Sequence, residues 1–399
     1  MKIEMKAFHQ RLQKKMKKNN LLLHLIVSVV ITSVILCSCD YQSEEEMIKP
    51  KYTFLIGAYT DESAQGIGLL DFDPEAGVLN ANVIASEVQN PSFVIANEGQ
   101  NLVFTVEETA GKDGGKVKVF EFERDSQKLT QKDEKSTFGD HPCYLSLSPD
   151  EKFLVVGNYS GGNFSAYKID QGNLTHVQTF AHEGQSINSS RQEKAHVHST
   201  VFHPNGQYLL VGDLGTDKIH LYDFNPDFAV PFQPAAFPYI EVEGGVGPRH
   251  LIIHPKGNTV YLIHELSAEI GVYGFEDGQM RHIQTVSLTD KNFIGAVGAA
   301  ELRFSPDNKF LYASNRGDAN EISSFEIDKE GKLNFVERIK SGGIMPRNFI
   351  ITKDGKYVLA AHQETSDIVV FERNLRNGKL SKTNLKVNFN KPVYLYELD

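Results

Sequence analysis

The chain has 399 residues, of which 40 % are hydrophobic and 23 % are charged, and its formal net charge is −10. This balance is ordinary for a soluble globular protein, and it argues against a general nucleic-acid binder, which needs a basic face to meet phosphates. A small anionic ligand is compatible with it, because a few local arginines can bind one on an acidic protein.

The first 39 residues have the pattern of an export signal. Lysines at positions 14, 15, 17 and 18 precede an apolar run at 21–36, and Leu-Cys-Ser-Cys follows at 36–39. A basic region, a short apolar region and a small-residue site are typical of a secretory signal. The apolar run is short for a membrane span, so an uncleaved membrane anchor is the weaker alternative.

The end of this segment resembles a bacterial lipobox, in which Cys39 would carry lipid and become the mature N-terminus. We therefore expect an exported protein that is lipid-anchored to a bacterial membrane, with residues 40–50 as a polar tether. Cys143 would then be the single cysteine of the mature chain. The sequence accordingly predicts neither an intramolecular disulfide nor a cysteine metal site.

The rest of the chain repeats one pattern about every fifty residues. An apolar strand leads to a Pro-centred turn and a second apolar strand, and an alternating run and a further strand follow. The turn prolines Pro149, Pro204, Pro255 and Pro306 are 55, 51 and 51 residues apart. Four strands in about fifty residues are the signature of a β-propeller blade.

Six full copies begin near Pro91, Pro142, Val197, Pro248, Ala299 and Pro346. The leftover strands, "KPVYLYEL" at the C-terminus and "YTFLIGAYT" near position 52, complete a seventh copy. We therefore predict an all-β, seven-bladed propeller over residues 51–399, with four antiparallel strands per blade. The N- and C-terminal strands would share one blade and close the ring, which removes open sheet edges. Since a closed ring needs no partner for stability, we expect a monomer.

The copies share two columns of residues. The position after the first-strand proline holds Ser92, Cys143, His198, Arg249, Ala300, Arg347 and Val393. Near the end of the second strand we align Glu107, Asn158, Asp213, Glu265, Asn315 and His362. Because the two strands are antiparallel, the start of one lies beside the end of the other. We therefore expect both columns at one face of the ring, near its central funnel.

Several of these residues have structural alternatives. Asn and Asp at strand ends often bond to the local turn backbone, so Asn158 and Asn315 need not be functional. Four histidines on outer strands or loops are expected in solvent: His176, His182, His220 and His282. The arginines are harder to explain structurally, because a buried guanidinium such as that of Arg249 or Arg347 needs an anionic partner.

Four motifs together resemble the seven-bladed lactonase propellers: "GPRH" at 247–250, "HEL" at 264–266, "SNR" at 314–316 and "MPRN" at 345–348. That family includes bacterial propeller-type 6-phosphogluconolactonases and fungal carboxymuconate-lactonising enzymes, and the resemblance covers roughly residues 52–399. It implies a catalytic set of His198, Arg249, Glu265 and Arg316. His264 stands where the family more usually has Asn. To substrate binding we assign Arg347, Asp213, His250 and His362.

Opening a lactone needs an activated water and a stabilised oxyanion. Either His198 or Glu265 would be the base, Arg249 and Arg316 would hold the anion, and Arg347 would bind an acidic substituent. This chemistry requires no metal and no cofactor. The export signal fits an unphosphorylated sugar lactone or another acidic lactone better than a cytosolic phosphorylated one, and the sequence does not choose between them.

Two other functions are compatible with the sequence. A metal-dependent lactonase propeller would hold Ca²⁺ through the oxygen atoms of Glu107, Asn158, Asp213, Glu265 and Asn315, although arginines in the same funnel would repel the cation. A non-catalytic binding propeller is the other alternative, because the fold does not determine the function. An intact set of His198, Arg249, Glu265 and Arg316 favours the enzyme.

Overall fold

The computed structural model describes residues 51–61, 66–112 and 114–398, together with Lys14 and Met16. The predicted signal, the lipidation site Cys39 and the tether therefore lie outside the described residues, apart from those two positions. The chain divides into units 1–49 and 50–399, and the second is the unit considered below. Within the described part of the chain, no helix has the length and apolar character of a membrane span.

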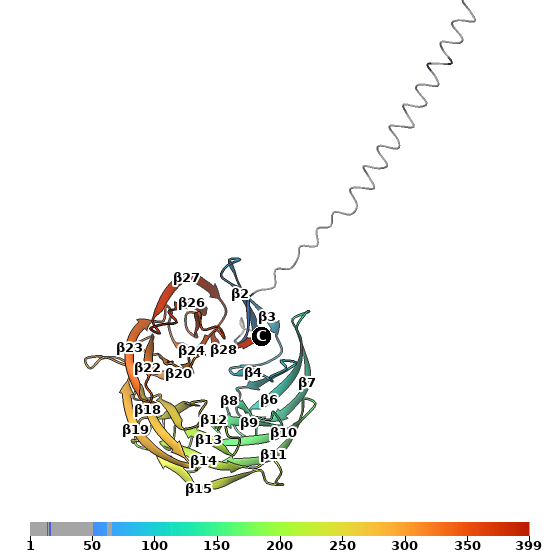
Figure 1. Cartoon of the computed structure of the whole chain (residues 1–399). Helices are drawn as coiled ribbons and strands as arrows, with labels where there is room; N and C mark the ends of the chain where they lie inside the picture. Colours follow the sequence, from blue (N-terminus) through green and yellow to red (C-terminus); the bar gives the residue numbers. More distant parts are fainter. Residues whose placement is uncertain (1–13, 15, 17–50, 62–65, 113, 399) are drawn as a thin grey trace, which may run out of the picture. The chain divides into compact units, whose positions relative to one another are not determined.

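The described strands form seven four-stranded antiparallel sheets, arranged as blades in a ring (Figure 1). Blade 1 contains β28 (Pro392–Leu398), β1 (Tyr52–Ala58), β2 (Ile67–Asp73) and β3 (Val78–Ala85), and blade 2 contains β4 (Val94–Ala96), β5 (Leu102–Glu107), β6 (Lys116–Glu123) and β7 (Lys128–Ser136). Blade 3 contains β8 (Pro142–Leu147), β9 (Phe153–Asn158), β10 (Asn163–Asp170) and β11 (Asn173–Ala181), and blade 4 contains β12 (Val197–Phe202), β13 (Tyr208–Asp213), β14 (Lys218–Phe224) and β15 (Phe232–Glu241). Blade 5 contains β16 (Pro248–Ile253), β17 (Thr259–His264), β18 (Glu269–Glu276) and β19 (Gln279–Ser287). Blade 6 contains β20 (Ala299–Phe304), β21 (Phe310–Asn315), β22 (Glu321–Ile327) and β23 (Leu333–Lys340). Blade 7 contains β24 (Pro346–Ile351), β25 (Tyr357–His362), β26 (Asp367–Arg373) and β27 (Leu380–Asn388).

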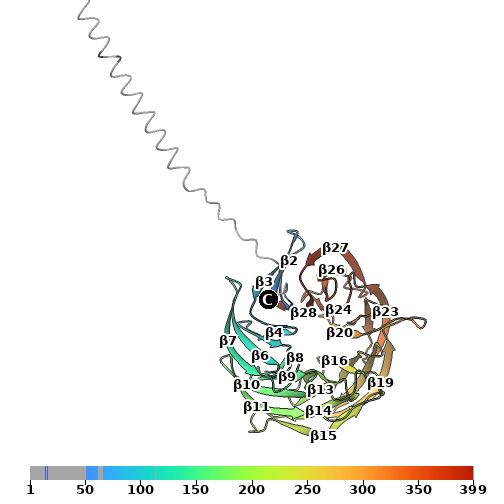
Figure 2. The ribbon, with the colours of Figure 1, turned by 180° about the vertical axis from the view of Figure 1, so that it is seen from behind.

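The ring closes through blade 1, as the sequence predicted. The C-terminal strand β28 pairs antiparallel with β1, from Thr53 opposite Leu398 to Gly57 opposite Tyr394. In the view from behind, β28 again lies on the inner side of blade 1 (Figure 2). The predicted seven-bladed, all-β fold with a shared closing blade is therefore confirmed.

The blades pack face to face through apolar side chains. The second strands are buried along their whole length in several blades, as in β9 and β17, whereas the outermost strands alternate half-buried and exposed residues, as in most of β27. Tyr261 of blade 5 packs with Leu302 and Phe325 of blade 6 in one such fully buried cluster. Because this packing holds the ring together, the innermost strand ends are free to carry polar side chains.

Candidate active site

One pocket collects polar side chains from six of the blades and a loop. It has a volume of about 340 Å³ and is lined by Glu108, Cys143, Tyr159, Arg191, His198, Arg249, Glu265, Arg316 and Arg347. The predicted catalytic set of His198, Arg249, Glu265 and Arg316 is therefore brought together, and Arg347 lies with it.

A repeated backbone irregularity aims the first-strand residues into this pocket. Cys143, His198, Arg249 and Arg347 each follow the first residue of an innermost strand, and each lies where the register with the second strand shifts. A β-bulge of this kind turns a side chain out of the regular alternation. Four members of the predicted first-strand column therefore face the pocket, each at a β-bulge in its own blade.

The second-strand column needs a correction at Glu265. The ladder pairs Pro248 with His264, in the same way as it pairs Val197 with Asp213. His264 is therefore the equivalent of Asp213, and Glu265 stands one residue later. The pocket-lining column is this later one, and its members in the pocket are Glu108, Tyr159, Glu265 and Arg316.

The column that ends the second strands serves the turn backbone instead. Asp213 accepts hydrogen bonds from the backbone N–H groups of His196 and Gly215 at 2.8 and 3.0 Å, and Asn315 accepts one from Gly298 at 3.0 Å. Asn158 donates to the Thr137 carbonyl at 2.9 Å. These contacts support the structural alternative for Asn158 and Asn315.

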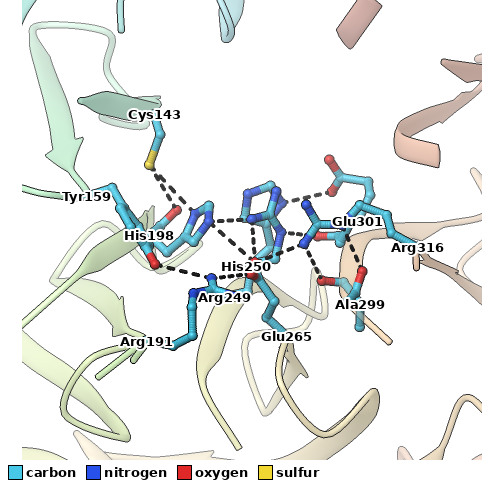
Figure 3. A network of polar contacts seen from close by, with 12 residues as sticks. Cys143, Tyr159, Arg191, His198, Arg249, His250, Glu265, Ala299, Glu301 and Arg316 are labelled. Carbon is cyan, nitrogen blue, oxygen red and sulfur yellow. Dashed lines mark hydrogen bonds and ion pairs between the residues drawn. The ribbon is translucent and has the colours of Figure 1, made fainter. Parts of the chain in front are cut away.

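Glu265 is the centre of the pocket's ion network (Figure 3). Its Oε2 lies 2.8 Å from Nη1 of Arg249 and 3.0 Å from Nη2 of Arg316, and its Oε1 lies 2.5 Å from Nη2 of Arg191. Burial alone would raise the pKa of Glu265, but Arg316 and Arg249 hold it well below its usual range. The carboxylate is therefore ionised and committed to three guanidinium groups, which makes it a poor proton acceptor.

The local backbone explains why Glu265 points inward. Gly247 adopts a φ of 69°, which favours glycine, and its carbonyl accepts the backbone N–H of Glu265 at 2.8 Å. Asp217 in turn accepts the N–H of Gly247 at 2.8 Å. The first residue of "GPRH" thus ties the start of β16 to the residue that follows β17, and so places Arg249 and Glu265 side by side.

His198 is buried beside this network as a neutral imidazole. Its Nε2 contacts Nη1 of Arg249 and lies 3.7 Å from Oε2 of Glu265, while its Nδ1 lies 3.6 Å from Sγ of Cys143. Because the guanidinium can only donate, Nε2 carries the lone pair and Nδ1 the proton. Burial, followed by the charge of Arg249, holds the pKa of His198 well below its ordinary value of 6.5. His198 is therefore an unprotonated base at neutral pH.

The pocket carries more positive than negative charge. It contains four arginines, 191, 249, 316 and 347, against the carboxylates of Glu265 and Glu108. Glu108 accepts hydrogen bonds from the Tyr59 hydroxyl at 3.1 Å and from Ser92. Arg347 lies 5.4 Å above the Tyr59 ring and, among the described residues, has no carboxylate within ion-pair distance. The site is thus suited to an anionic ligand or a developing oxyanion.

Three of the four residues assigned to substrate binding do not line the pocket. His250 lies 3.4 Å from Glu301 through Nδ1 and packs edge-to-face on the His198 ring at 5.4 Å, so it supports His198 from behind. His362 is fully buried and pairs with Asp367 at 2.8 Å. Asp213 caps backbone groups as described above. Of the four residues, Arg347 alone lines the pocket.

Two of the histidines expected in solvent are also corrected. The side chains of His182 and His220 are 2 % and 15 % exposed, because both face Asp213 and their rings stack at 3.8 Å. These three residues are the one group of potential metal ligands found within the described residues. The five oxygen donors of the Ca²⁺ alternative do not meet at one point, because Glu107 pairs with Lys118 at 2.8 Å, Asp213 faces His182 and Glu265 lies in the pocket.

Sequence reasoning missed three pocket residues. Glu108 and Tyr159 each follow the residue that had been placed in the second-strand column, so a shift of one position would have found them. Arg191 lies in the loop between β11 and β12, where no repeat pattern applies. No sequence signal placed its guanidinium in the funnel.

The fold and the site together define a seven-bladed β-propeller with a buried histidine–arginine–glutamate pocket in its funnel. The model of the family described as Lactonase, 7-bladed beta-propeller matches residues 53–396, and the chain therefore belongs to this family. The resemblance stated from the sequence motifs is thereby confirmed.

Similar proteins support this assignment. The chain is 30 % identical over 348 residues to the 6-phosphogluconolactonase of Bacillus subtilis, which covers 86 % of this chain and 97 % of the relative. It is 30 % identical over 332 residues to the 6-phosphogluconolactonase of Formosa agariphila, covering 82 % and 94 %. The solved structure of the periplasmic gluconolactonase of Pseudomonas aeruginosa superposes with a TM-score of 0.83 at 35 % identity, over 87 % of this chain and 99 % of that one.

Proposed function

We propose that the protein hydrolyses a sugar-acid lactone by 6-phosphogluconolactonase-like chemistry. The observation that carries this proposal is the neutral His198 beside Arg249, Glu265 and Arg316 in one pocket. Membership of the lactonase propellers and the activities in the names of the relatives support it. A neutral base and a group of fixed cations are the two elements that ester hydrolysis requires.

In the proposed reaction His198 is the base and Glu265 is the residue that orients the arginines. Nε2 of His198 takes a proton from a water molecule, and the water oxygen bonds to the lactone carbonyl carbon. Arg249 turns its N–H from the imidazole toward the carbonyl oxygen, which becomes an oxyanion held with Arg316. Collapse of this intermediate breaks the ring C–O bond, and the imidazolium returns the proton to the ring oxygen. The product is an open hydroxy acid, which releases one proton to solvent.

Arg347 is proposed to bind an acidic substituent of the lactone, because its guanidinium faces the pocket without a carboxylate partner among the described residues. The reaction needs no metal in this account. A Ca²⁺-dependent mechanism is disfavoured by the contacts of its oxygen donors, which are engaged with lysine, backbone and arginine groups.

We also propose that the protein is exported and acts as a lipid-anchored monomer. The basic and apolar segments followed by "LCSC" support export, as does the periplasmic location in the name of the Pseudomonas aeruginosa relative. Mass spectrometry of the native N-terminus tests this, with a mature chain beginning at lipid-modified Cys39 as the expected result. An unmodified Cys39 in a chain that keeps residues 1–38 would contradict it.

A lactone panel assayed by acid release tests the activity. The purified 50–399 unit should hydrolyse at least one of glucono-δ-lactone, 6-phosphogluconolactone and a carboxylate-bearing sugar lactone, with the same rate in the presence of a chelator. Loss of activity with chelator would favour the metal-dependent mechanism. Binding of a lactone or its acid without turnover would favour the non-catalytic propeller.

A further inference from the structure

A loop outside the repeat brings an additional cation to the solvent side of the pocket. The loop spans residues 182–196, between β11 and β12, and its Arg191 contacts Oε1 of Glu265 at 2.5 Å and the Tyr159 hydroxyl at 3.3 Å (Figure 3). The Arg191 side chain is 42 % exposed, whereas those of Arg249 and Arg316 are 2 % and 8 % exposed. A ligand that enters from solvent therefore meets Arg191 first.

Both ends of this loop are fastened to the same buried carboxylate. Oδ2 of Asp213 lies 2.9 Å from Nδ1 of His182, and Oδ1 accepts the backbone N–H of His196 at 2.8 Å. Nε2 of His182 lies 2.9 Å from the Tyr222 hydroxyl, and the His196 ring stacks on Tyr159 at 4.5 Å. Asp213 is fully buried, so these bonds are shielded from competing water.

The backbone next to Arg191 is fixed by a third anchor. The fully buried Gln192 donates to the Leu214 carbonyl at 2.9 Å and accepts the backbone N–H of Asn188 at 3.1 Å. The base of the Arg191 side chain is therefore held in place, and only the long side chain beyond it can change partner. This arrangement reduces the conformational entropy that the guanidinium would lose on binding a ligand.

Glu265 does not depend on Arg191 for charge compensation. Its other oxygen, Oε2, already contacts Arg249 and Arg316. If Arg191 turned to another anion, the carboxylate would keep two of its three cationic partners. A planar guanidinium fork matches the geometry of a phosphate or a carboxylate through two parallel hydrogen bonds.

Building on the proposed lactonase function, we propose that Arg191 is a specificity-determining residue that binds an anionic substituent of the lactone, a phosphate or a carboxylate. We assign to Asp213 the role of a positioning residue, which fixes the loop that carries Arg191. Arg347 would meet the same substituent from within the ring, and Arg191 from the solvent side. The release of Oε1 of Glu265 from Arg191 would allow it to accept a hydrogen bond from a lactone hydroxyl.

The variant Arg191→Ala tests the specificity role on three probes: glucono-δ-lactone, 6-phosphogluconolactone and a carboxylate-bearing sugar lactone. We expect kcat/KM to fall about 10- to 100-fold through KM for a charged lactone, the range for a lost hydrogen bond to a charged group, with little change for the neutral one. A loss on only one charged probe identifies the substituent. Lys194→Ala is the matched control, because it removes a cation from the same loop whose Nζ, among the described residues, hydrogen-bonds only to the Ser160 carbonyl.

Equal losses on all three lactones, or no loss on either charged one, would overturn the specificity role. A parent protein that turns over only the neutral lactone would also overturn it. If the parent protein hydrolyses none of the three probes, the proposed lactonase function itself fails, which is a distinguishable result.

The variant Asp213→Asn tests the positioning role. It keeps the side-chain size and removes the charge, so we expect faster trypsin cleavage after Arg191 or Lys194 and a reduced preference for charged lactones. The kcat for the neutral lactone should stay near that of the parent. Asp367→Asn is the matched control, because it weakens the contacts of another buried carboxylate, with His362 and Lys386, which lie outside the 182–196 loop. Cleavage at the parental rate with an unchanged preference, or the same effects in Asp367→Asn, would refute the role of Asp213.

Discussion

The substitution Glu265→Gln removes one negative charge from between three guanidinium groups. Arg249 and Arg316 lie 2.8 and 3.0 Å from Oε2, and Arg191 lies 2.5 Å from Oε1. Breaking a buried ion pair by removing one partner costs about 3–5 kcal/mol, because an uncompensated charge stays buried. With an unfolding entropy of about 2.1 cal/mol/K per residue, a loss of ~4 kcal/mol lowers the Tm of the 50–399 unit by roughly 5 °C.

This loss of stability should depend on pH in a defined direction. Although burial would raise it, the pKa of Glu265 is held well below its usual range by the arginines. A carboxylate with a depressed pKa contributes stability that is fully present above its unfolded-state pKa of about 4.3 and is lost as the pH falls through its folded-state pKa. The Tm difference between parent and variant should therefore be constant from about pH 6 to 8 and shrink at more acidic pH.

Thermal melts followed by circular dichroism at several pH values measure this difference. Glu276→Gln is a suitable control, because Glu276 is exposed at the end of β18 in the same blade and its loss should leave the Tm unchanged. A Glu265→Gln variant that melts with the parent at pH 7 would refute the assignment of Glu265 as the charge centre of the pocket. A difference that persists undiminished down to pH 3 would refute the ionised state assigned to it.

Three further predictions concern ring closure, the base and the anion site. Deleting residues 390–399 removes β28 and its buried side chains, whose burial stabilises the fold by about 1.5–3 kcal/mol each. The cooperative melt should therefore be lost. A truncated protein with the parental Tm would contradict the ring order. In the pH–rate profile, the acidic limb of kcat/KM should lie below pH 6.5. Arg249→Met should move this limb to higher pH, because the charge of Arg249 lowers the pKa of His198. A limb at the same pH in the variant would indicate that another group is the base. Arg347→Ala should raise KM for an acidic lactone more than for a neutral one. Equal changes in KM for the two lactones would contradict the role of Arg347 in binding the acidic substituent.

The fold could be predicted from the sequence because the same order of apolar runs and turns recurs about every fifty residues. Turn prolines mark four blades and apolar strand pairs mark six, and the unmatched strands at the two ends left closure through a shared blade as the consistent solution. The structure also brings His198, Arg249 and Arg347 into one pocket, in agreement with their shared position in the repeat.

The errors arise where the backbone departs from the repeat. The sequence alignment placed Glu265 in the column of second-strand ends, where His264 belongs. The pairing of Pro248 with His264 across the ladder, which corrects this, is not visible in the sequence. Asp213 was given a role in the pocket, whereas its carboxylate bonds to turn backbone and to His182. Contacts of this kind join segments far apart in the chain, and one sequence contains no periodic signal for them.

Arg191 shows the same limit more strongly. Its loop has no strand alternation and is longer than the equivalent connections between the other blades, and its place over Glu265 depends on anchors at His182, Gln192 and His196. The residues that such a loop contributes to a site become visible only when the structure shows what they contact.

Turnover of a lactone by the parent protein and by Arg249→Ala, measured side by side as acid release, is the decisive test of the proposed site. Arg249 joins His198 to Glu265 and is the proposed donor to the oxyanion. We expect chelator-insensitive hydrolysis by the parent protein and a loss in kcat/KM on the order of 10²-fold or more in the variant, as for a lost oxyanion donor. Hydrolysis by Arg249→Ala at the parental rate would contradict the proposed site.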